Sequence, residues 1–331
     1  IVKYVDEYLK TGKPVIKVDN VMNLKKFEDL NIDRFKNTRA FLKIQDGCNN
    51  FCTYCIIPYA RGRVRSRDKD SVLNQAKTLV ANGYVEIVLT GIHTAGYGED
   101  LDNYSFYDLL VDLVKIDGLK RLRISSIETS QISDEIINLI GSNDIIVDHL
   151  HIPLQSGCDA TLKRMNRRYT AKEYEAAVNL LRETLPDVSI STDVIVGFPG
   201  ETEEDFEESY EFVKKIHFYE THIFKYSRRH GTKAASMDGQ LTEAAKAQRS
   251  DRMLELHEIR AREYEEAMIG KKMELLLEEE IEIDGRPWYV GHSREYVRAV
   301  ISKTDAHRVN DLVTVKAVAF VRDHILETKE V

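Results

Sequence analysis

Three of the chain's four cysteines lie within one short segment, CNNFCTYC, which spans residues 48 to 55. The spacing is Cys48-x3-Cys52-x2-Cys55, and an aromatic residue, Tyr54, directly precedes the last cysteine. Three thiolates are an odd number for disulfides and one ligand short of the closed tetrahedral shell of a structural zinc site. The segment therefore predicts metal or redox chemistry, with one position still to be filled.

The cysteines alone leave three chemistries open. A reactive C-x-x-C pair at Cys52 and Cys55 would leave Cys48 without a role. An iron-sulfur cluster held by three thiolates would leave one iron free to meet a substrate. A structural zinc ion would need a fourth ligand, and histidine is a frequent one. The candidates for that fourth ligand are Cys158, His93, His149 and His151.

Composition excludes several classes of protein. The chain has 331 residues, 43% of them hydrophobic, which is enough to bury a full core. It has no apolar run of the roughly 18–20 residues that a membrane span needs and no signal-peptide pattern at its start. We therefore expect a cytosolic protein, where reduced thiols favour metal or redox roles. A net charge of -8 means that any nucleic acid must be held by local basic patches.

From Ala40 onward, short β-rich runs alternate with amphipathic stretches of helical length. The predicted strands are 40–45, 85–90, 122–127, 147–152, 188–196 and 221–226. This alternation predicts parallel strands with helical crossovers, either in an incomplete barrel or in an open doubly wound sheet. In both architectures the ligand site lies at the carboxyl ends of the strands, which is where the distinctive segments of this sequence occur.

Capping signals place the helices between these strands. Ser71 is the expected N-cap of a helix that Gly83 ends, and Thr170 and Thr202 begin capping-box patterns. A long charged helix ends at Gly270, and alternating residues beyond it predict a five-stranded antiparallel barrel. We divide the chain into 1–38, 39–268 and 269–331, and we expect 1–38 to be a linker or the remnant of a longer domain.

The cysteine motif resembles the C-x3-C-x-aromatic-C signature of the radical S-adenosylmethionine (SAM) superfamily. Other segments resemble, in order, those of the methylthiotransferases, which add a methylthio group to a tRNA base or a ribosomal protein. These are FLKIQDGCNNFCTYCIIPYARGRVRSR, VLTGIHTAGYG, SSIE, HIPLQSGCDATLKRMNRRYT and STDVIVGFPGETEEDF. The resemblance covers roughly residues 39 to 331. It implies a partial (βα)6 radical SAM barrel followed by an RNA-binding TRAM domain.

This resemblance implies a reaction and a set of cofactors. Cys48, Cys52 and Cys55 would ligate a 4Fe-4S cluster whose fourth iron chelates SAM, and a flavodoxin or ferredoxin would supply the electron. The radical would remove hydrogen from C2 of adenosine 37 in the tRNA anticodon loop. The segment TGIHTAGYG is most similar to enzymes that act on N6-threonylcarbamoyladenosine, with isopentenyladenosine or a ribosomal protein as the alternatives. The family carries a second 4Fe-4S cluster on an N-terminal domain, which we expect to be missing from this chain.

The resemblance also implies residues that contact SAM, although a loop cap or turn is the alternative role for several of them. Tyr54 and Ile57 would lie against the adenine. The absence of a side chain at Gly91 would allow its backbone to approach the SAM amino group. The full set implied to bind the cofactor is Tyr54, Ile57, Thr90, Gly91, Glu128, Gln155, Asp193 and Gly197.

Basic residues follow three of the predicted strands and could converge on a phosphate backbone, although a run of charge is usually a solvated surface. In the C-terminal module, Tyr289, His292 and Tyr296 are candidate base-stacking residues. A non-enzymatic alternative is an RNA-binding protein with a structural zinc ion. The candidate RNA-binding arginines are Arg61, Arg63, Arg65, Arg67, Arg167, Arg168, Arg228, Arg229, Arg294 and Arg298.

Overall fold

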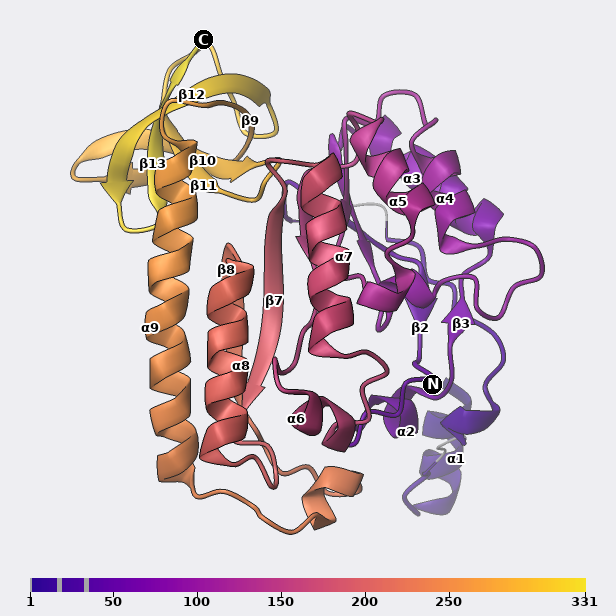
Figure 1. Cartoon of the computed structure of the whole chain (residues 1–331). Helices are drawn as coiled ribbons and strands as arrows, with labels where there is room; N and C mark the ends of the chain where they lie inside the picture. Colours follow the sequence, from indigo (N-terminus) through magenta and orange to yellow (C-terminus); the bar gives the residue numbers. More distant parts are fainter. Residues whose placement is uncertain (1, 17–19, 33–35) are drawn as a thin grey trace.

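The computed structural model describes residues 2–16, 20–32 and 36–331. Parallel strands joined by helices form the larger part, and a second β module stands at the amino-terminal end of those strands (Figure 1). The predicted linker 1–38 contains an exposed helix, α1 (Val2–Thr11), which buries no residue. Positions 1, 17–19 and 33–35 of that predicted linker lie outside the described residues.

All six predicted strands are confirmed. They form two parallel sheets of order β1-β4-β5 and β6-β7-β8, and an isolated bridge between Leu122 and Ile146 links the two sheets. The strands are β1 (Ala40–Lys43), β4 (Glu86–Thr90), β5 (Arg121–Ile124), β6 (His149–His151), β7 (Ser189–Val196) and β8 (Glu220–Lys225). Their order in space follows the chain order without the reversal that defines a doubly wound sheet. The described strands therefore form an open arc.

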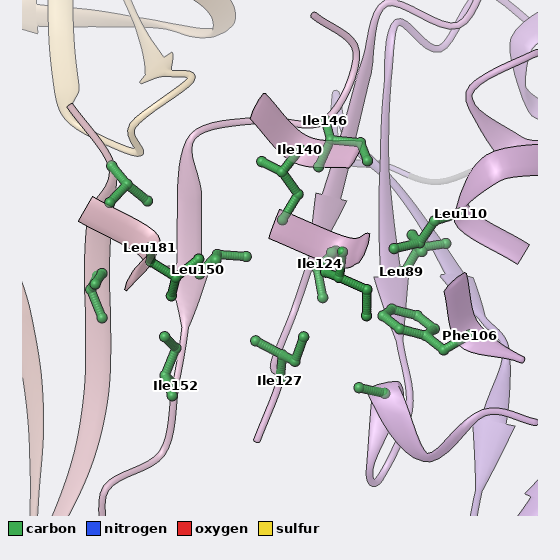
Figure 2. Packing of buried hydrophobic residues seen from close by; sticks show 14 of the residues in the cluster. Leu89, Phe106, Leu110, Ile124, Ile127, Ile140, Ile146, Leu150, Ile152 and Leu181 are labelled. Atoms are coloured by element: carbon green, nitrogen blue, oxygen red, sulfur yellow. The ribbon is translucent and has the colours of Figure 1, made fainter. Parts of the chain in front are cut away.

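Helices follow the strands and bury one face of the arc. Figure 2 shows Phe106 and Leu110 of α4 beside Leu89 of β4, all three in the main hydrophobic core. Burying such side chains contributes roughly 1.5–3 kcal/mol each, so this layer fixes the strand positions. The helices after the strands are α3 (Lys69–Ala81), α4 (Phe106–Leu113), α5 (Asp134–Gly141), α6 (Asp159–Arg164), α7 (Ala171–Thr184) and α8 (Glu203–Ile216).

The capping predictions are confirmed in all but one case. Thr170 and Thr202 each form a complete capping box with the acidic residue three positions later. The expected N-cap Ser71 is wrong, because Asp68 caps α3 and its carboxylate accepts a hydrogen bond from the Ser71 amide at 3.0 Å. An aspartate accepts from the amide three residues on as well as serine does, so the helix begins earlier. Gly83 follows α3 with a φ of +94°, as expected of a residue that ends a helix.

A short antiparallel pair, which the sequence did not predict, closes the cysteine segment into a loop. The two strands are β2 (Gln45–Asp46) and β3 (Arg65–Ser66), and α2 (Ile57–Arg61) lies between them. This pair continues directly from β1. The three cysteines are thereby held at the carboxyl end of the first strand of the arc.

The C-terminal part begins with the 26-residue helix α9 (Glu243–Met268), which packs on α8, β7 and β8. Five strands follow, and their pairings close in the order β10-β11-β13-β12-β9. The prediction of a wholly antiparallel module is wrong in one pair, because β11 and β13 run parallel. The strands are β9 (Lys272–Ile283), β10 (Arg286–Ser293), β11 (Arg298–Ser302), β12 (Leu312–Arg322) and β13 (Ile325–Glu330).

Buried ion pairs join this module to the amino-terminal ends of β4 and β5. The Glu86 side chain is 1% exposed and accepts a hydrogen bond from Arg123 Nε at 2.8 Å. Arg121, which is fully buried, reaches Glu86 Oε2 at 3.5 Å and Glu274 Oε1 of β9 at 2.8 Å. Arg294 of the module donates to Asp148 Oδ2 at 2.9 Å. These contacts tie the two parts of the chain together.

The described residues contain no helix that is both long enough and apolar enough to span a bilayer. The long helix α9 does not qualify, because charged residues occur throughout it.

Candidate functional site

The cysteine loop is folded by its own backbone. The Cys48 amide donates to the Gly62 carbonyl at 3.1 Å, and the Cys55 amide donates to the Cys52 carbonyl at 2.9 Å. Phe51 occupies the left-handed region with a φ of +49°, which turns the chain between the first two cysteines. Cys48, Cys52 and Cys55 are all half-buried, so their sulfurs are neither sealed in a core nor free in solvent.

Loops from two distant strands hold this loop in place. The Thr53 amide donates to the Met165 carbonyl at 3.0 Å, and the Thr53 carbonyl accepts from the Ala234 amide at 2.8 Å. Asn166 donates from Nδ2 to the Asn50 carbonyl at 3.2 Å. The segments after β6 and β8 thus clamp the segment after β1, as expected for a site at the carboxyl ends of parallel strands.

The sulfur atoms are spread more widely than the ligands of a single metal ion. Zinc–sulfur bonds of about 2.3 Å would place tetrahedral thiolates about 3.8 Å apart. Among the described residues, the one set of three potential ligands with all its atoms within 4.8 Å is His151, Asp193 and His222, and the cysteines form no such set. This spacing argues against a structural zinc ion on the cysteine loop.

Three of the four candidates for a fourth zinc ligand have other partners. Cys158 is buried at the start of α6, and its Sγ lies 3.5 Å from Asp205 Oδ1 on α8. His149 lies at the opposite end of β6 and stacks on Tyr296 of the C-terminal module, with ring centroids 4.9 Å apart. His151 bonds to Ser191 Oγ at 2.9 Å. None of these side chains completes a tetrahedral site with the three cysteines.

Burial affects the ionisation of the loop. It raises the pKa of the Cys48 thiol to about 11 and also raises the pKa of Cys55. Without a metal these two thiols are therefore protonated at neutral pH, and a metal group bound there displaces their protons. Burial also holds the pKa of the Tyr54 hydroxyl well above its usual value. The Tyr54 ring packs edge-on against Phe198, with the ring centroids 6.3 Å apart.

Arg167 contacts the cysteine loop directly, which the sequence did not predict. Its Nη1 donates to Cys52 Sγ at 3.3 Å, and its Nη2 lies 3.1 Å from Glu128 Oε1. Glu128 in turn accepts from Asn50 Nδ2 at 3.1 Å. Burial lowers the pKa of Arg167, but nearby tyrosines, Glu128 and Cys52 outweigh it and raise that pKa well above the usual value. A fixed positive charge therefore stands next to one of the sulfurs.

A cavity of ≈ 480 Å³ opens beside the cysteine loop and is lined by that loop, by the loop after β6, by β7 and β8, and by the segment after β8. The predicted residues that line it are Tyr54, Cys55, Ile57, Gln155, Asp193 and Arg229. Gln155 adopts a φ of +67° and bridges to Val194 of β7, which turns the chain at the cavity wall. The lining residues that the sequence analysis missed are Ile56, Ile195, Phe224, Lys225, Tyr226 and Ser227.

The alternation of side chains along β8 could have identified one of these missed residues, Phe224. Side chains two apart in a strand share a face, so Phe224 faces the same side as His222. Phe224 is 52% exposed although it is a large aromatic residue. An exposed aromatic on the edge strand of the arc indicates a binding surface rather than a core position.

Three other residues predicted to contact SAM do not line the cavity. Gly197 has a φ of +71°, and a Cβ there would come within 2.2 Å of Lys246 Cγ, so the turn requires glycine. At Gly91 a Cβ would meet Gln45 Oε1 at 2.9 Å, so packing on Gln45 already accounts for that glycine. Thr90 accepts a backbone hydrogen bond from Ile44 at 2.9 Å, as part of the strand pairing.

Comparison with known proteins identifies the family. Residues 42–213 match the radical SAM superfamily. The threonylcarbamoyladenosine tRNA methylthiotransferase MtaB of Bacillus subtilis is 47% identical over 316 residues, which cover 95% of this chain and 70% of that protein. The chain belongs to the radical SAM methylthiotransferases.

Other relatives agree with this family. The Aquifex aeolicus protein of the same name as the B. subtilis enzyme is 42% identical and covers 85% of this chain and 68% of that protein. A tRNA-2-methylthio-N(6)-dimethylallyladenosine synthase of Finegoldia magna is 37% identical over 96% of this chain and 68% of its own length. The radical SAM methyltransferase TsrM of Kitasatospora setae matches with a TM-score of 0.50 and 20% identity, covering 59% of this chain and 38% of TsrM. That likeness supports the α/β radical SAM fold.

Membership in the radical SAM family implies a 4Fe-4S cluster and SAM. The residues present fit such a group. Three thiols share one loop, their sulfurs are spread too widely for a single ion, and the loop opens through Cys55 onto the ≈ 480 Å³ cavity. A three-thiolate cluster leaves one iron without a protein ligand. The three thiols therefore fit a cluster whose remaining iron can take a ligand bound in the adjoining cavity.

The predicted RNA-binding arginines divide into a group that is bonded within the protein and a group that is exposed. Arg65 and Arg67 are buried and bonded within the protein, for example Arg67 Nη2 to Asp29 Oδ1 at 2.7 Å. Arg167 contacts the cysteine loop, and Arg294 is bonded between the module and Asp148, so neither lies on an open RNA surface. Tyr289 is buried, and Tyr296 is stacked between His149 and His292. The arginines that remain exposed are Arg61, Arg63, Arg168, Arg228, Arg229 and Arg298.

Proposed function

We propose that this radical SAM methylthiotransferase adds a methylthio group at C2 of N6-threonylcarbamoyladenosine at position 37 of tRNA. The observation that carries the proposal is the 47% identity, over 95% of the chain, to the B. subtilis enzyme that is named for this substrate. The relative named for dimethylallyladenosine is 37% identical over a similar length. The higher identity favours threonylcarbamoyladenosine as the substrate.

In this proposal, Cys48, Cys52 and Cys55 ligate the 4Fe-4S cluster through their thiolates. A bound cluster supplies the electron that cleaves SAM to methionine and a 5'-deoxyadenosyl radical. The protein's own part is to position the reactants and exclude water. Support comes from the half-buried state of all three cysteines and from the backbone clamp that the β6 and β8 loops place on Thr53.

We assign the ≈ 480 Å³ cavity to SAM. Tyr54 and Ile57 would contact its adenine, while Gln155 would accept or donate hydrogen bonds at the polar end. The exposed ring of Phe224 offers a further stacking surface. Gly197 shapes the turn after β7 at the same end of the arc, where its missing side chain leaves room for Lys246. Glu128 would act from the next loop, beside Asn50 and Arg167.

The tRNA would approach from the cysteine-loop side. Phe51 and Tyr59 contact edge-to-face at 5.8 Å, and Arg63 lies over the Phe51 ring at 5.4 Å. Tyr59 is 54% exposed, and Arg228 lines the same open depression on the surface. Exposed aromatics with adjacent arginines suit unpaired bases and phosphates. We further assign the C-terminal β module to the RNA-binding TRAM class, with 39–268 as the catalytic domain and 269–331 as the module.

The sulfur for the reaction needs a separate source. Three of the chain's four cysteines are used by the first cluster, and Cys158 is buried against Asp205. We therefore propose that the second 4Fe-4S cluster of the family is bound by cysteines outside residues 1–331. A flavodoxin or ferredoxin would reduce the first cluster. Iron analysis of the full gene product tests the second cluster, and about four irons per chain after reconstitution would contradict it.

Mass spectrometry of tRNA nucleosides tests the substrate. Deleting the gene is expected to remove 2-methylthio-N6-threonylcarbamoyladenosine and leave its unthiolated precursor. Restoring the wild-type gene should recover the modification, whereas the Cys52→Ala gene should not. If the deletion instead removes the methylthio derivative of isopentenyladenosine, the proposed substrate is wrong.

A further inference from the structure

A second group of potential metal ligands lies inside the arc, apart from the cysteine loop. His151 ends β6, Asp193 lies within β7, and His222 lies within β8. Asp193 and His222 are directly paired in the parallel register, and His151 pairs with Ser191, two residues before Asp193. Since residues two apart share a face of a strand, all three side chains point to the same side.

These side chains are already gathered. One ligand atom from each lies within 4.8 Å of the other two. His151 Nε2 is 3.3 Å from Asp193 Oδ2, and the rings of His151 and His222 are 5.6 Å apart between centroids. We propose that His151, Asp193 and His222 form a binding site for a divalent transition-metal ion of the zinc type, independent of the cysteine loop.

Supporting contacts orient the first histidine as a ligand. His151 uses Nδ1 for a 2.9 Å hydrogen bond with Ser191 Oγ, which leaves Nε2 directed at Asp193. Ser191 is itself held by His149 Nε2 at 3.0 Å. A hydrogen bond on the second ring nitrogen is the usual way in which proteins fix the tautomer and orientation of a metal-binding histidine.

The charge balance also suits a cation. The single ion-pairing partner of Asp193 among the described residues is His151, so no lysine or arginine neutralises its carboxylate. Two imidazoles and one carboxylate are a ligand set that borderline ions such as Zn²⁺ and Co²⁺ prefer. This ligand set contains no cysteine, which separates its chemistry from that of the cysteine loop.

The site can close around an ion with little movement. Zinc–nitrogen bonds of about 2.0–2.1 Å require ligand atoms roughly 3.3 Å apart. The His222 side chain is 43% exposed on the edge strand, compared with 15% for His151 and 27% for Asp193. A rotation of the His222 side chain can therefore bring its ring to the other two ligands. Three protein ligands leave at least one position for water, at the side where Asp193 meets the cavity.

Cobalt spectroscopy and zinc binding test the site separately from the proposed enzyme activity. With the cluster reconstituted, we expect one Zn²⁺ per chain by equilibrium dialysis in addition to the cluster iron. His222→Gln and His151→Gln should each weaken this binding at least tenfold. The control His217→Asn changes an exposed histidine at the end of α8 and should bind as the wild type does.

Co²⁺ added to the C48A/C52A/C55A variant should show visible d–d bands without a sulfur-to-cobalt charge-transfer band. Wild-type zinc binding that His222→Gln does not weaken would overturn the proposal, as would a cobalt signal that vanishes with the three cysteines. Circular dichroism melting confirms that each variant is folded. His222→Gln carries the test if His151→Gln does not fold, because His222 is the more exposed of the two.

Discussion

The amino-terminal ends of the parallel strands are locked by buried ion pairs, whereas their carboxyl-terminal ends open onto the cysteine loop and a cavity. At the first end, Glu86 is 1% exposed and lies between Arg121 and Arg123. At the second end, Lys225 and Arg229 line the cavity, and neither side chain has a hydrogen-bond or ion-pair partner among the described residues. Figure 1 shows the β module at the first end and helices α2 and α6 at the second.

This difference separates stability from chemistry along the same strands. Buried charges that lack partners are costly, so the amino-terminal end is held in one arrangement by pairing every charge. Cations without protein partners at the carboxyl-terminal end are free to meet an anionic ligand. Substitutions at the first end should lower the free energy of unfolding, and substitutions at the second end should lower activity while leaving the fold intact.

The largest expected effect comes from the cysteine loop. Cys52→Ala removes one of the three proposed cluster ligands and should abolish the formation of 5'-deoxyadenosine, with little change in melting temperature. The matched control is Cys158→Ala, which removes a buried thiol that contacts Asp205 instead. Absorbance near 400 nm and chromatography of the SAM products measure the result. Persistent SAM cleavage in Cys52→Ala would contradict the cluster assignment.

A large effect on stability, and none on activity, is expected at the amino-terminal ends of the parallel strands. Glu86→Gln leaves two buried guanidinium groups without their carboxylate, and breaking such a pair costs about 3–5 kcal/mol. Urea unfolding should show this loss, while SAM cleavage per folded molecule stays unchanged. Glu279→Gln, at an exposed site on β9, serves as the control. Equal stability of the two variants would refute the role assigned to the ion pairs.

The same carboxylate sets a pH dependence of stability. Burial alone would raise the pKa of Glu86, but Arg123 and Arg121 outweigh it and hold the pKa below its usual value. A lowered folded-state pKa contributes stability that is fully present above the unfolded pKa and is lost as pH falls through the folded value. The stability difference between wild type and Glu86→Gln should therefore shrink in acid, as urea titrations at several pH values can show.

Arg167 tests whether the charge beside Cys52 matters to the cluster. Hydrogen bonds to cluster sulfurs set the reduction potential, and changes in such supporting groups typically cost 10- to 100-fold in activity. Arg167→Gln should shift the midpoint potential of the cluster and slow SAM cleavage by about that factor. The neighbouring Arg168→Gln, whose side chain is exposed, should change neither. An unshifted potential in Arg167→Gln, measured by redox titration, would assign Arg167 a purely structural role.

The smallest effects are expected from the exposed arginines. Arg63→Ala removes one cation beside Phe51 and should weaken tRNA binding across sequences, reducing the salt slope by about one. Lys115→Ala removes an exposed cation just after the end of α4 and should leave the slope unchanged. Binding at several salt concentrations distinguishes them. The same slope for both variants would remove Arg63 from the RNA surface.

Much of the fold was predictable from local patterns. The six strands, the two threonine capping boxes and the segment CNNFCTYC each depend on residues close in sequence, and the structure confirms the strands and the caps. The N-cap of α3 was misplaced because Asp68 and Ser71 are both good caps three residues apart. The parallel pairing of β11 and β13 was missed because alternation predicts strands but not their neighbours.

The functional residues also divide into those that local sequence predicts and those that only the tertiary structure reveals. The sequence by itself determined that three thiols share one short segment with the spacing of a metal or redox site, since that spacing is a local property. The arginines all look alike in a sequence, and tertiary structure alone decided that Arg167 meets Cys52, Arg294 meets Asp148, and Arg63 stays exposed. The physical reason is that burial and pairing of a charge depend on groups brought from distant segments, 115 residues apart for Arg167 and Cys52.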